Sequence, residues 1–116
     1  MRNFRFAPQA QRDLRRITER IERESGADRA ARFRSEVVRA VASLALHPYS
    51  GHERPDLTAR SVRFTSVFKY LIVYEPTSVP LVVLHVVYGG RDPADLRDRV
   101  GEPVIEYSVS HAPGGP

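Results

Sequence analysis

The sequence predicts a small α+β domain, in which an N-terminal strand and an antiparallel αα-hairpin pack on a small antiparallel sheet in the order β-α-α-β-β-β. Two consecutive segments with helical apolar spacing fill the first half of the chain, and residues 62–88 are dense in β-branched and aromatic residues. The length of 116 residues and the 41% hydrophobic content fit a single core. We expect one domain over residues 1–100 and a partly disordered extension over residues 101–116.

A short strand and a helix are expected at the N-terminus. Residues 3–7 alternate in character, with Phe4 and Phe6 on one face. Pro8 suits the first position of a helix, where the missing N–H of proline costs nothing. A helix over residues 8–24 is then predicted by one apolar stripe, formed by Ala10, Leu14, Ile17 and Ile21.

A second helix is predicted directly after the first. Ser25-Gly26 ends the first helix, and Asp28 is expected to cap the second. His47-Pro48 ends it, because the residue before proline avoids helical backbone angles. So short a connection makes the two helices antiparallel, and each needs a further layer to cover its apolar stripe. The second stripe consists of Ala30, Phe33, Val37, Val41 and Leu44.

Strands are expected to form most of the second half, over residues 62–67, 68–75 and 81–88. Residues 49–60 read as a loop, and a Pro-bounded turn joins the last two strands. Residues 93–99 are expected to add a short helix that Asp92 starts. In the tail, residues 104–109 either add a strand or belong to a loosely ordered extension.

Composition excludes several classes of site. The chain has no cysteine, so disulfides, thiol catalysis and cysteine-bound metals are excluded. The four histidines lack the spacing of metal ligands, and no Gly-rich phosphate loop is present, so no cofactor is expected. The sequence has no apolar run long enough to span a membrane and no signal-peptide pattern. We therefore expect a soluble cytoplasmic protein.

The chain is strongly basic, with a net charge of +4 and a pI of about 10.0. Lys69 is the only lysine among 18 basic residues, so 17 are arginine. A GC-rich genome explains most of this preference for arginine, but it explains the net charge less well. The charge indicates a partner that carries phosphates or carboxylates, such as nucleic acid or an acidic protein surface.

The candidates for function are basic and aromatic residues on or near the last three strands: Arg63, Lys69, His85, Tyr88 and Arg91. Lys69 is expected on the middle strand, and His85 is expected to share a strand face with Val83 and Val87. Grouped around one groove, such side chains could hold a phosphodiester and stabilise a developing charge. They could equally bind the carboxylates of a protein.

Several of these residues also have a purely structural interpretation. Arg91 and Asp92 fit a structural pair in which Asp92 caps the turn after the last strand. Arg63 fits a solvated strand position, and His85 fits a half-buried histidine with satisfied hydrogen bonds. Tyr70 and Tyr74 fit core aromatics with hydrogen-bonded tips. A row of arginines on the first helix fits a solvated face with glutamates nearby, and its members are Arg12, Arg16, Arg20 and Arg23.

Several short motifs follow one another along residues 4–99, and none of them is specific alone. They are Ala7-Pro8-Gln9-Ala10, Asp13-Leu14-x-x-Ile17, His47-Pro48-Tyr49-Ser50-Gly51, Tyr70-Leu71-Ile72-Val73-Tyr74 and Gly89-Gly90-Arg91-Asp92. In this order and spacing they make the chain resemble the RelE/ParE superfamily, the small toxins of bacterial type II toxin–antitoxin modules.

The resemblance implies one of two activities. RelE-like members cut mRNA in the ribosome with a basic cluster, whereas ParE-like members poison DNA gyrase and are not nucleases. A key arginine of the cutting branch lies at the position that looks like Leu71, and leucine cannot stabilise a phosphorane charge. Arg91 does match the basic residue after the last strand. The ParE-like branch is therefore favoured, with Arg63, Lys69 and Arg91 as target-binding residues.

Two alternatives stay open at this point. The first is a ribosome-dependent mRNA endoribonuclease, in which Arg63, Lys69 and Arg91 hold the phosphodiester and Tyr88 or His85 carries protons. The second is a degenerate module that is kept only to bind antitoxin or to autoregulate through DNA. The second alternative predicts no toxicity when the protein is expressed alone.

The resemblance also implies partners. A cognate antitoxin is expected to be an acidic, partly disordered, ParD-like chain that folds onto the toxin through an amphipathic helix. DNA gyrase is the expected target, with the ribosome and mRNA as the alternative. Operator DNA is expected to bind only the toxin–antitoxin complex, and no membrane is involved. Growth arrest and plasmid stabilization are the effects implied for such a module.

Overall fold

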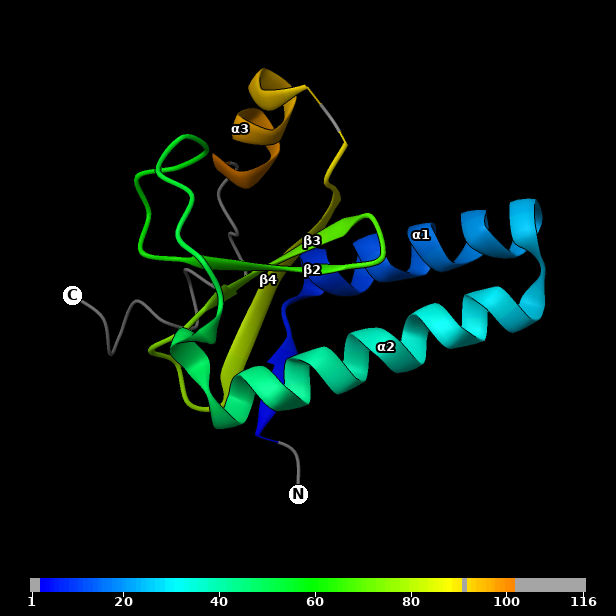
Figure 1. Ribbon diagram of the computed structural model, residues 1–116, viewed down its shortest axis with the longest axis horizontal. Coiled ribbons are helices and arrows are strands. Elements are labelled where there is room, and N and C mark those ends of the chain that lie inside the picture. Colours follow the sequence, from blue (N-terminus) through cyan, green and yellow to red (C-terminus); the bar gives the residue numbers. More distant parts are fainter. Residues whose placement is uncertain (1–2, 91, 102–116) are drawn as a thin grey trace.

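The computed structural model describes residues 3–90 and 92–101, and within them the predicted order of elements is confirmed (Figure 1). The elements are β1 (Phe4–Phe6), α1 (Pro8–Ser25), α2 (Ala27–Leu46), the 3-10 helix η1 (Pro48–Ser50), β2 (Arg63–Val67), β3 (Tyr70–Glu75), β4 (Leu81–Tyr88) and α3 (Pro93–Gly101). None of the described helices is long and apolar enough to cross a membrane. The strand considered for residues 104–109 lies outside the described residues, and the domain limit at residue 100 stays a prediction.

The sheet is mixed, which corrects the predicted antiparallel sheet. Its strand order is β1-β4-β3-β2, with β3 antiparallel to both neighbours and β1 parallel to β4. Hairpin loops force β2, β3 and β4 to alternate in direction, but the long helical crossover leaves β1 free to run parallel. Hydrogen bonds from Leu81 N to Asn3 O and from Ala7 N to Val83 O, each 2.9 Å, fix β1 beside the first half of β4.

The αα-hairpin is confirmed, and its connection is a single residue. Gly26 ends α1 and immediately precedes α2, with a φ of 97° that side-chain-bearing residues rarely adopt. Asp28 therefore lies inside the first turn of α2, and the prediction that it caps this helix is wrong. The two helices run antiparallel, and their far end projects beyond the sheet (Figure 1).

The middle strand begins later than predicted, which moves Lys69. Phe68 and Lys69 form the tight turn between β2 and β3, where Phe68 has a φ of 55°. Two-residue hairpin turns require positive φ angles, so the chain leaves the strand conformation here. The prediction that Lys69 lies on a strand is therefore wrong.

An extra residue in β4 changes which side chains of this strand point to each face of the sheet. Val73 pairs with His85 and Tyr74 pairs with Val83, so one extra residue of β4 is accommodated between them. Val83 consequently packs in one core cluster and Val87 in the other. His85 shares its face with its cross-strand partner Val73, so the prediction that it shares a face with both valines is wrong. It is also fully buried rather than half-buried, with 3% exposure.

Each face of the sheet carries its own hydrophobic cluster. The first lies between the sheet and the αα-hairpin, where the predicted helical stripes meet Ile72, Tyr74 and Val86. The second lies on the other face, where Leu96 and Val100 of α3 pack on Leu71, Val73, Val82, Leu84 and Val87. With both faces covered, β4 is buried from Leu81 to Val87.

A buried carboxylate joins α1 to the sheet. Asp13 is only 1% exposed, and its Oδ2 accepts a hydrogen bond from the backbone N–H of Val86 (3.0 Å). Its Oδ1 accepts from Gln9 Nε2 (2.9 Å) and from Arg16 Nη2 (3.0 Å). A buried carboxylate is tolerated only when such donors satisfy it. Asp13 thus fixes where α1 sits along β4.

The loop after α2 is tied to β3 by one tyrosine. The buried Tyr74 hydroxyl donates to Pro48 O (2.7 Å) and accepts from Gly51 N (3.0 Å). Burial raises the pKa of Tyr74, while the Gly51 hydrogen bond and the charge of Arg63 act in the opposite direction. A side chain at Gly51 would collide with the Tyr74 hydroxyl, which explains the glycine. The prediction of a core tyrosine with a bonded tip is confirmed for Tyr74.

The Asp13 link predicts a large loss of stability in Asp13→Ala. The substitution leaves the buried Val86 N–H without its acceptor and removes a charge-assisted hydrogen bond. The free energy of unfolding should therefore fall by about 2–3 kcal/mol. Urea unfolding followed by circular dichroism measures this. Glu19→Ala removes an exposed carboxylate of the same helix and should change little. Equal losses in the two variants would contradict the structural role of Asp13.

The Tyr74 contacts predict that Tyr74→Phe destabilises the protein by about 1–3 kcal/mol, because Gly51 N–H and Pro48 O both lose a partner. Tyr49→Phe is the matched control, since Tyr49 is exposed and keeps its ring over Arg63. Thermal unfolding of both variants decides the point. A Tyr74→Phe variant as stable as the control would show that the hydroxyl does not anchor this loop.

Candidate functional site

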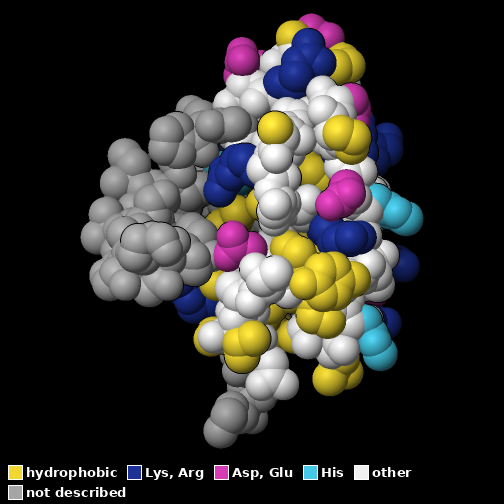
Figure 2. Space-filling model, turned by 90° about the vertical axis from the view of Figure 1, so that its left-hand side faces the viewer, with side chains coloured by type: hydrophobic (Ala, Val, Ile, Leu, Met, Phe, Trp, Pro, Cys, Tyr) yellow, Lys and Arg dark blue, Asp and Glu magenta, His cyan; other side chains and the backbone are white. Residues whose placement is uncertain are grey.

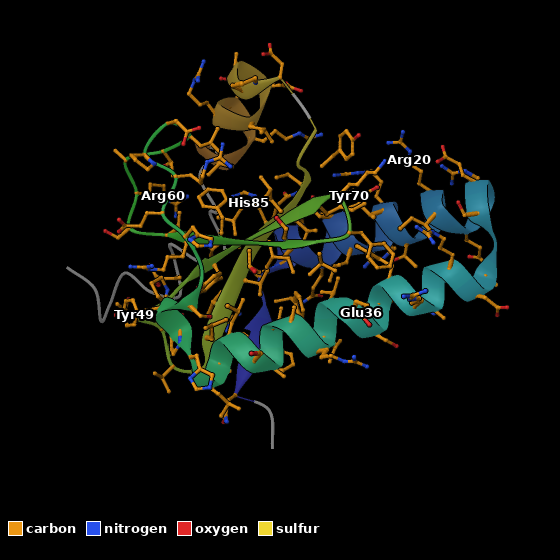
Figure 3. All side chains as sticks on the ribbon, viewed as in Figure 1. Arg20, Glu36, Tyr49, Arg60, Tyr70 and His85 are labelled. Atoms are coloured by element: carbon orange, nitrogen blue, oxygen red, sulfur yellow. The ribbon has the colours of Figure 1, made fainter. Side chains whose placement is uncertain are left out.

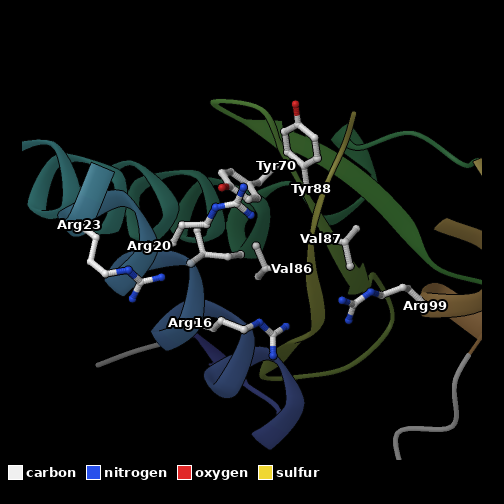
Figure 4. Close-up of a pocket in the computed structure, with 9 residues that line it drawn as sticks. Arg16, Arg20, Arg23, Tyr70, Val86, Val87, Tyr88 and Arg99 are labelled. Carbon is white, nitrogen blue, oxygen red and sulfur yellow. The ribbon is translucent and has the colours of Figure 1, made fainter. Parts of the chain in front are cut away.

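A basic cleft opens where α1 passes the end of β4 (Figure 4). Its volume is about 360 Å³. The residues that line it are Arg16, Ile17, Arg20 and Arg23 of α1, Tyr70 of β3, Val86, Val87 and Tyr88 of β4, and Arg99 of α3. Four of these nine residues are arginine and none is acidic, so the cleft is suited to an anionic ligand.

The arginines of α1 reach the cleft because of their spacing. Arg16, Arg20 and Arg23 are four and three residues apart, so they lie above one another on one side of the helix. Arg16 also contacts Asp13 (3.0 Å), and Arg20 contacts Glu24 (3.3 Å) in a pair that is exposed on both sides. Exposed pairs of this kind are weak, so the Arg20 guanidinium can readily exchange partners.

The floor of the cleft is already closed by the protein's own packing. Ile17, Val86 and Val87 are 8%, 2% and 4% exposed. Asp13 holds α1 on β4 at Val86, directly beside this floor. The surface left for a ligand is therefore mainly guanidinium groups and tyrosine rings.

Two tyrosines form an aromatic edge of the cleft. The rings of Tyr70 and Tyr88 pack edge to face at 5.7 Å, and Tyr70 packs in the same way on Phe33 of α2 at 5.3 Å. Tyr70 is therefore half-buried at the margin of the core, while Tyr88 is 40% exposed. A side chain at Gly90 would meet the tip of the Tyr88 ring, so this ring would have to shift.

Arg63 lies far from the cleft, at the other end of β2. Its Nη1 donates to Gly51 O (2.8 Å) and Tyr49 O (3.2 Å), and its guanidinium stacks on the Tyr49 ring at 5.1 Å. Six positions separate Arg63 from Lys69, about 20 Å of extended chain. Figure 3 shows Tyr49 and Tyr70 at opposite ends of the sheet. Arg63 therefore holds the loop instead of sharing a groove with Lys69.

The remaining candidates are only partly brought together. Tyr88 lines the cleft, whereas Lys69 is not among the lining residues. The Lys69 backbone lies beside the end of β4, because Gly89 N donates to Lys69 O (2.8 Å). His85 is buried on the face that Val73 occupies. Arg91 lies outside the described residues. Among the five candidates, the structure thus places Lys69 and Tyr88 together and separates Arg63 and His85 from them.

Sequence reasoning missed the arginines of the cleft. Their spacing was visible, but a row of arginines beside glutamates equally fits a solvated helix face. Arg12, the first of the row, lies outside the lining residues and bonds Gln9 Oε1 (3.1 Å). Arg99 comes from α3, about 75 positions further along the chain than Arg23, so its approach depends on the tertiary fold.

The lining side chains define what the cleft can do chemically. The described lining residues include neither histidine nor carboxylate, so the two tyrosines are the lining side chains that could carry a proton. In the part of the chain that the structure describes, no group of histidines and acids could hold a metal ion. Guanidinium groups can instead grip phosphates or carboxylates in a bidentate manner.

Comparisons with known proteins identify the family. The sequence model described as "ParE toxin of type II toxin-antitoxin system, parDE" matches residues 4–93, from β1 to the start of α3. A search of curated proteins found no match. A solved structure titled "Chromosomal ParDE TA system from P. aeruginosa" superposes with a TM-score of 0.63 at 18% identity, over 76% of this chain and 96% of that chain. At this identity the likeness shows a shared fold, whereas the family match covers most of the chain. The protein therefore belongs to the ParE toxin family of type II toxin–antitoxin systems.

Proposed function

We propose that this ParE-family toxin inhibits DNA gyrase by binding to it and is neutralised by a cognate antitoxin. The observation that carries the proposal is that two of the groups that RNA cutting would need, Arg63 and His85, lie away from the cleft that holds Tyr88. A nuclease must hold its charged and proton-carrying groups around one phosphodiester. Here Arg63 is engaged with the loop at one end of the sheet, and His85 is buried.

Leu71 supports the same proposal. It lies in the second hydrophobic cluster, against α3, and is buried. The RNA-cutting branch that the sequence resembles has a key arginine at this position. A buried leucine offers no charge to a reacting phosphate, so the described residues favour binding as the mode of action.

The target-binding surface proposed here is the basic cleft together with Lys69. Lys69 was predicted as a target-binding residue, and its backbone lies beside the end of β4, which carries the cleft residue Tyr88. Arg63 was also predicted as target-binding, and its loop-holding contacts give it an indirect part in this proposal. Arg91 keeps its proposed role on the strength of its place in the sequence, directly after Gly90.

The antitoxin is proposed to be acidic, partly disordered and ParD-like, folding as an amphipathic helix onto this chain. The net charge of +4 favours an acidic partner. An amphipathic helix also needs apolar surface, which this protein exposes around η1. Figure 2 shows hydrophobic side chains gathered at this end, where Leu46, Tyr49 and Val79 are exposed. Because DNA gyrase and the antitoxin are both proposed as its partners, we also propose that the toxin acts in the cytoplasm.

The proposal predicts that the purified protein blocks DNA supercoiling by gyrase and increases gyrase-dependent DNA cleavage. Arg20→Gln/Arg23→Gln should raise the inhibitory concentration by on the order of tenfold or more, since each lost charge-assisted contact is worth about 1.5–3 kcal/mol. Arg32→Gln/Arg34→Gln removes two exposed arginines from α2 and should leave inhibition unchanged.

A ribosome-dependent mRNA cutting assay on the same preparation is the counter-test. Unimpaired gyrase together with cut mRNA would overturn the proposal in favour of the endoribonuclease alternative. Inactivity in both assays would favour a degenerate module that retains only antitoxin or operator binding.

A further inference from the structure

The basic cleft presents charge in a regular row. The arginines Arg16, Arg20 and Arg23 span eight residues of α1, a rise of about 10 Å along the helix axis. Each guanidinium of the row can grip a phosphate, so the row can face successive phosphates of a nucleic acid strand. Arg99 adds a further guanidinium from the opposite wall (Figure 4).

An aromatic platform stands at the end of this row. Tyr88 exposes 40% of its surface, and its ring packs edge to face on Tyr70 at 5.7 Å. Figure 4 shows both tyrosines on the β-strand side of the cleft, with Tyr70 near Arg20 and the Tyr88 hydroxyl pointing away from the α1 arginines. A positively charged groove beside an exposed aromatic ring is the arrangement by which proteins bind unpaired bases and their backbone.

The floor of the cleft disfavours an amphipathic peptide as its occupant. Such a helix binds by burying an apolar face, but Ile17, Val86 and Val87 are already covered by the protein itself. Guanidinium forks and a phenol ring make up most of what remains, and these suit phosphates and bases better than apolar side chains.

We propose that this cleft binds a single DNA strand, through phosphate contacts of Arg20, Arg23 and Arg99 and base stacking on Tyr88. Arg16 contributes with the part of its guanidinium that Asp13 does not use. The choice of DNA rests on the proposed function, because a toxin bound to the gyrase–DNA complex would meet a DNA strand there. The cleft would then attach the toxin to the nucleic acid as well as to the enzyme.

Binding is tested without gyrase, by fluorescence anisotropy of a labelled single-stranded DNA oligonucleotide of mixed sequence over a salt series. Arg20→Gln/Arg23→Gln should weaken binding and lower the slope of log K against log salt by roughly 1.4, or 0.7 for each lost phosphate contact. Arg32→Gln/Arg34→Gln removes the same charge elsewhere and should keep the wild-type slope. Equal effects of the two double substitutions would overturn the proposal.

Stacking is tested at Tyr88 by two substitutions. Tyr88→Ala should weaken DNA binding roughly five- to 150-fold, whereas Tyr88→Phe keeps the ring and should bind like the wild type. Thermal unfolding of both variants checks that the fold is intact. If Tyr88→Ala is folded and binds as tightly as Tyr88→Phe, the aromatic part of the proposal is wrong.

Two competitors identify the ligand class. An RNA oligonucleotide of the same sequence and an oligoglutamate of the same charge should both displace the DNA only at higher concentrations than unlabelled DNA does. Tighter binding of the RNA, or of the acidic peptide, would overturn the assignment to DNA. These outcomes do not depend on the gyrase assay: a protein that binds DNA through the cleft but leaves gyrase active would refute the proposed function alone.

Discussion

The bond between the Asp13 carboxylate and the Val86 backbone N–H is the contact on which the site depends. It is the point where α1 is fixed to the central strand, and it requires a charged group to be buried almost completely. Burying a carboxylate is costly unless several donors meet it, and Gln9, Arg16 and Val86 supply them. This contact fixes the position of α1 along β4. The arginines of α1 therefore lie beside the end of β4, where the cleft is formed.

The two ends of the sheet serve different purposes. At the η1 end, Tyr74 and Arg63 use their polar groups to hold the loop 48–51, so little of their chemistry is left for a ligand. At the other end, Tyr88 and the α1 arginines are only lightly engaged and stay accessible. This division explains why Arg63 does not join the predicted basic cluster: it was assigned to the same groove as Lys69 but lies at the opposite end of β2.

Local patterns were sufficient to predict the helices and most of the sheet. The apolar stripes of α1 and α2 lie in the first core cluster as expected, and Gly26 ends α1. The errors arose where pairing decides the outcome. The parallel pairing of β1 and the extra residue in β4 depend on neighbouring strands. Neither can be predicted from the alternation of apolar and polar residues along a single strand. Lys69 was misplaced because hydrophobic density does not reveal a tight turn within an apolar run.

The site was harder to predict than the fold, for a physical reason. A binding cleft is assembled from elements distant in sequence, here α1, the β3 and β4 strands and α3. Arg20 and Arg23 have the same spacing whether they face solvent or a cleft, and only the position of α1 on β4 distinguishes the two cases. Asp13, the residue that sets this position, was visible in the sequence as part of a family motif, but its burial was not predicted.

The most direct test of the central claim is to induce this protein alone in bacteria and to follow chromosomal DNA breakage and mRNA integrity in the same cells. Our account predicts gyrase-dependent DNA breaks and an SOS response while mRNA stays intact. Site-specific mRNA cutting with intact DNA would contradict it, and would mean that the dispersed basic residues form a catalytic site when the protein meets the ribosome.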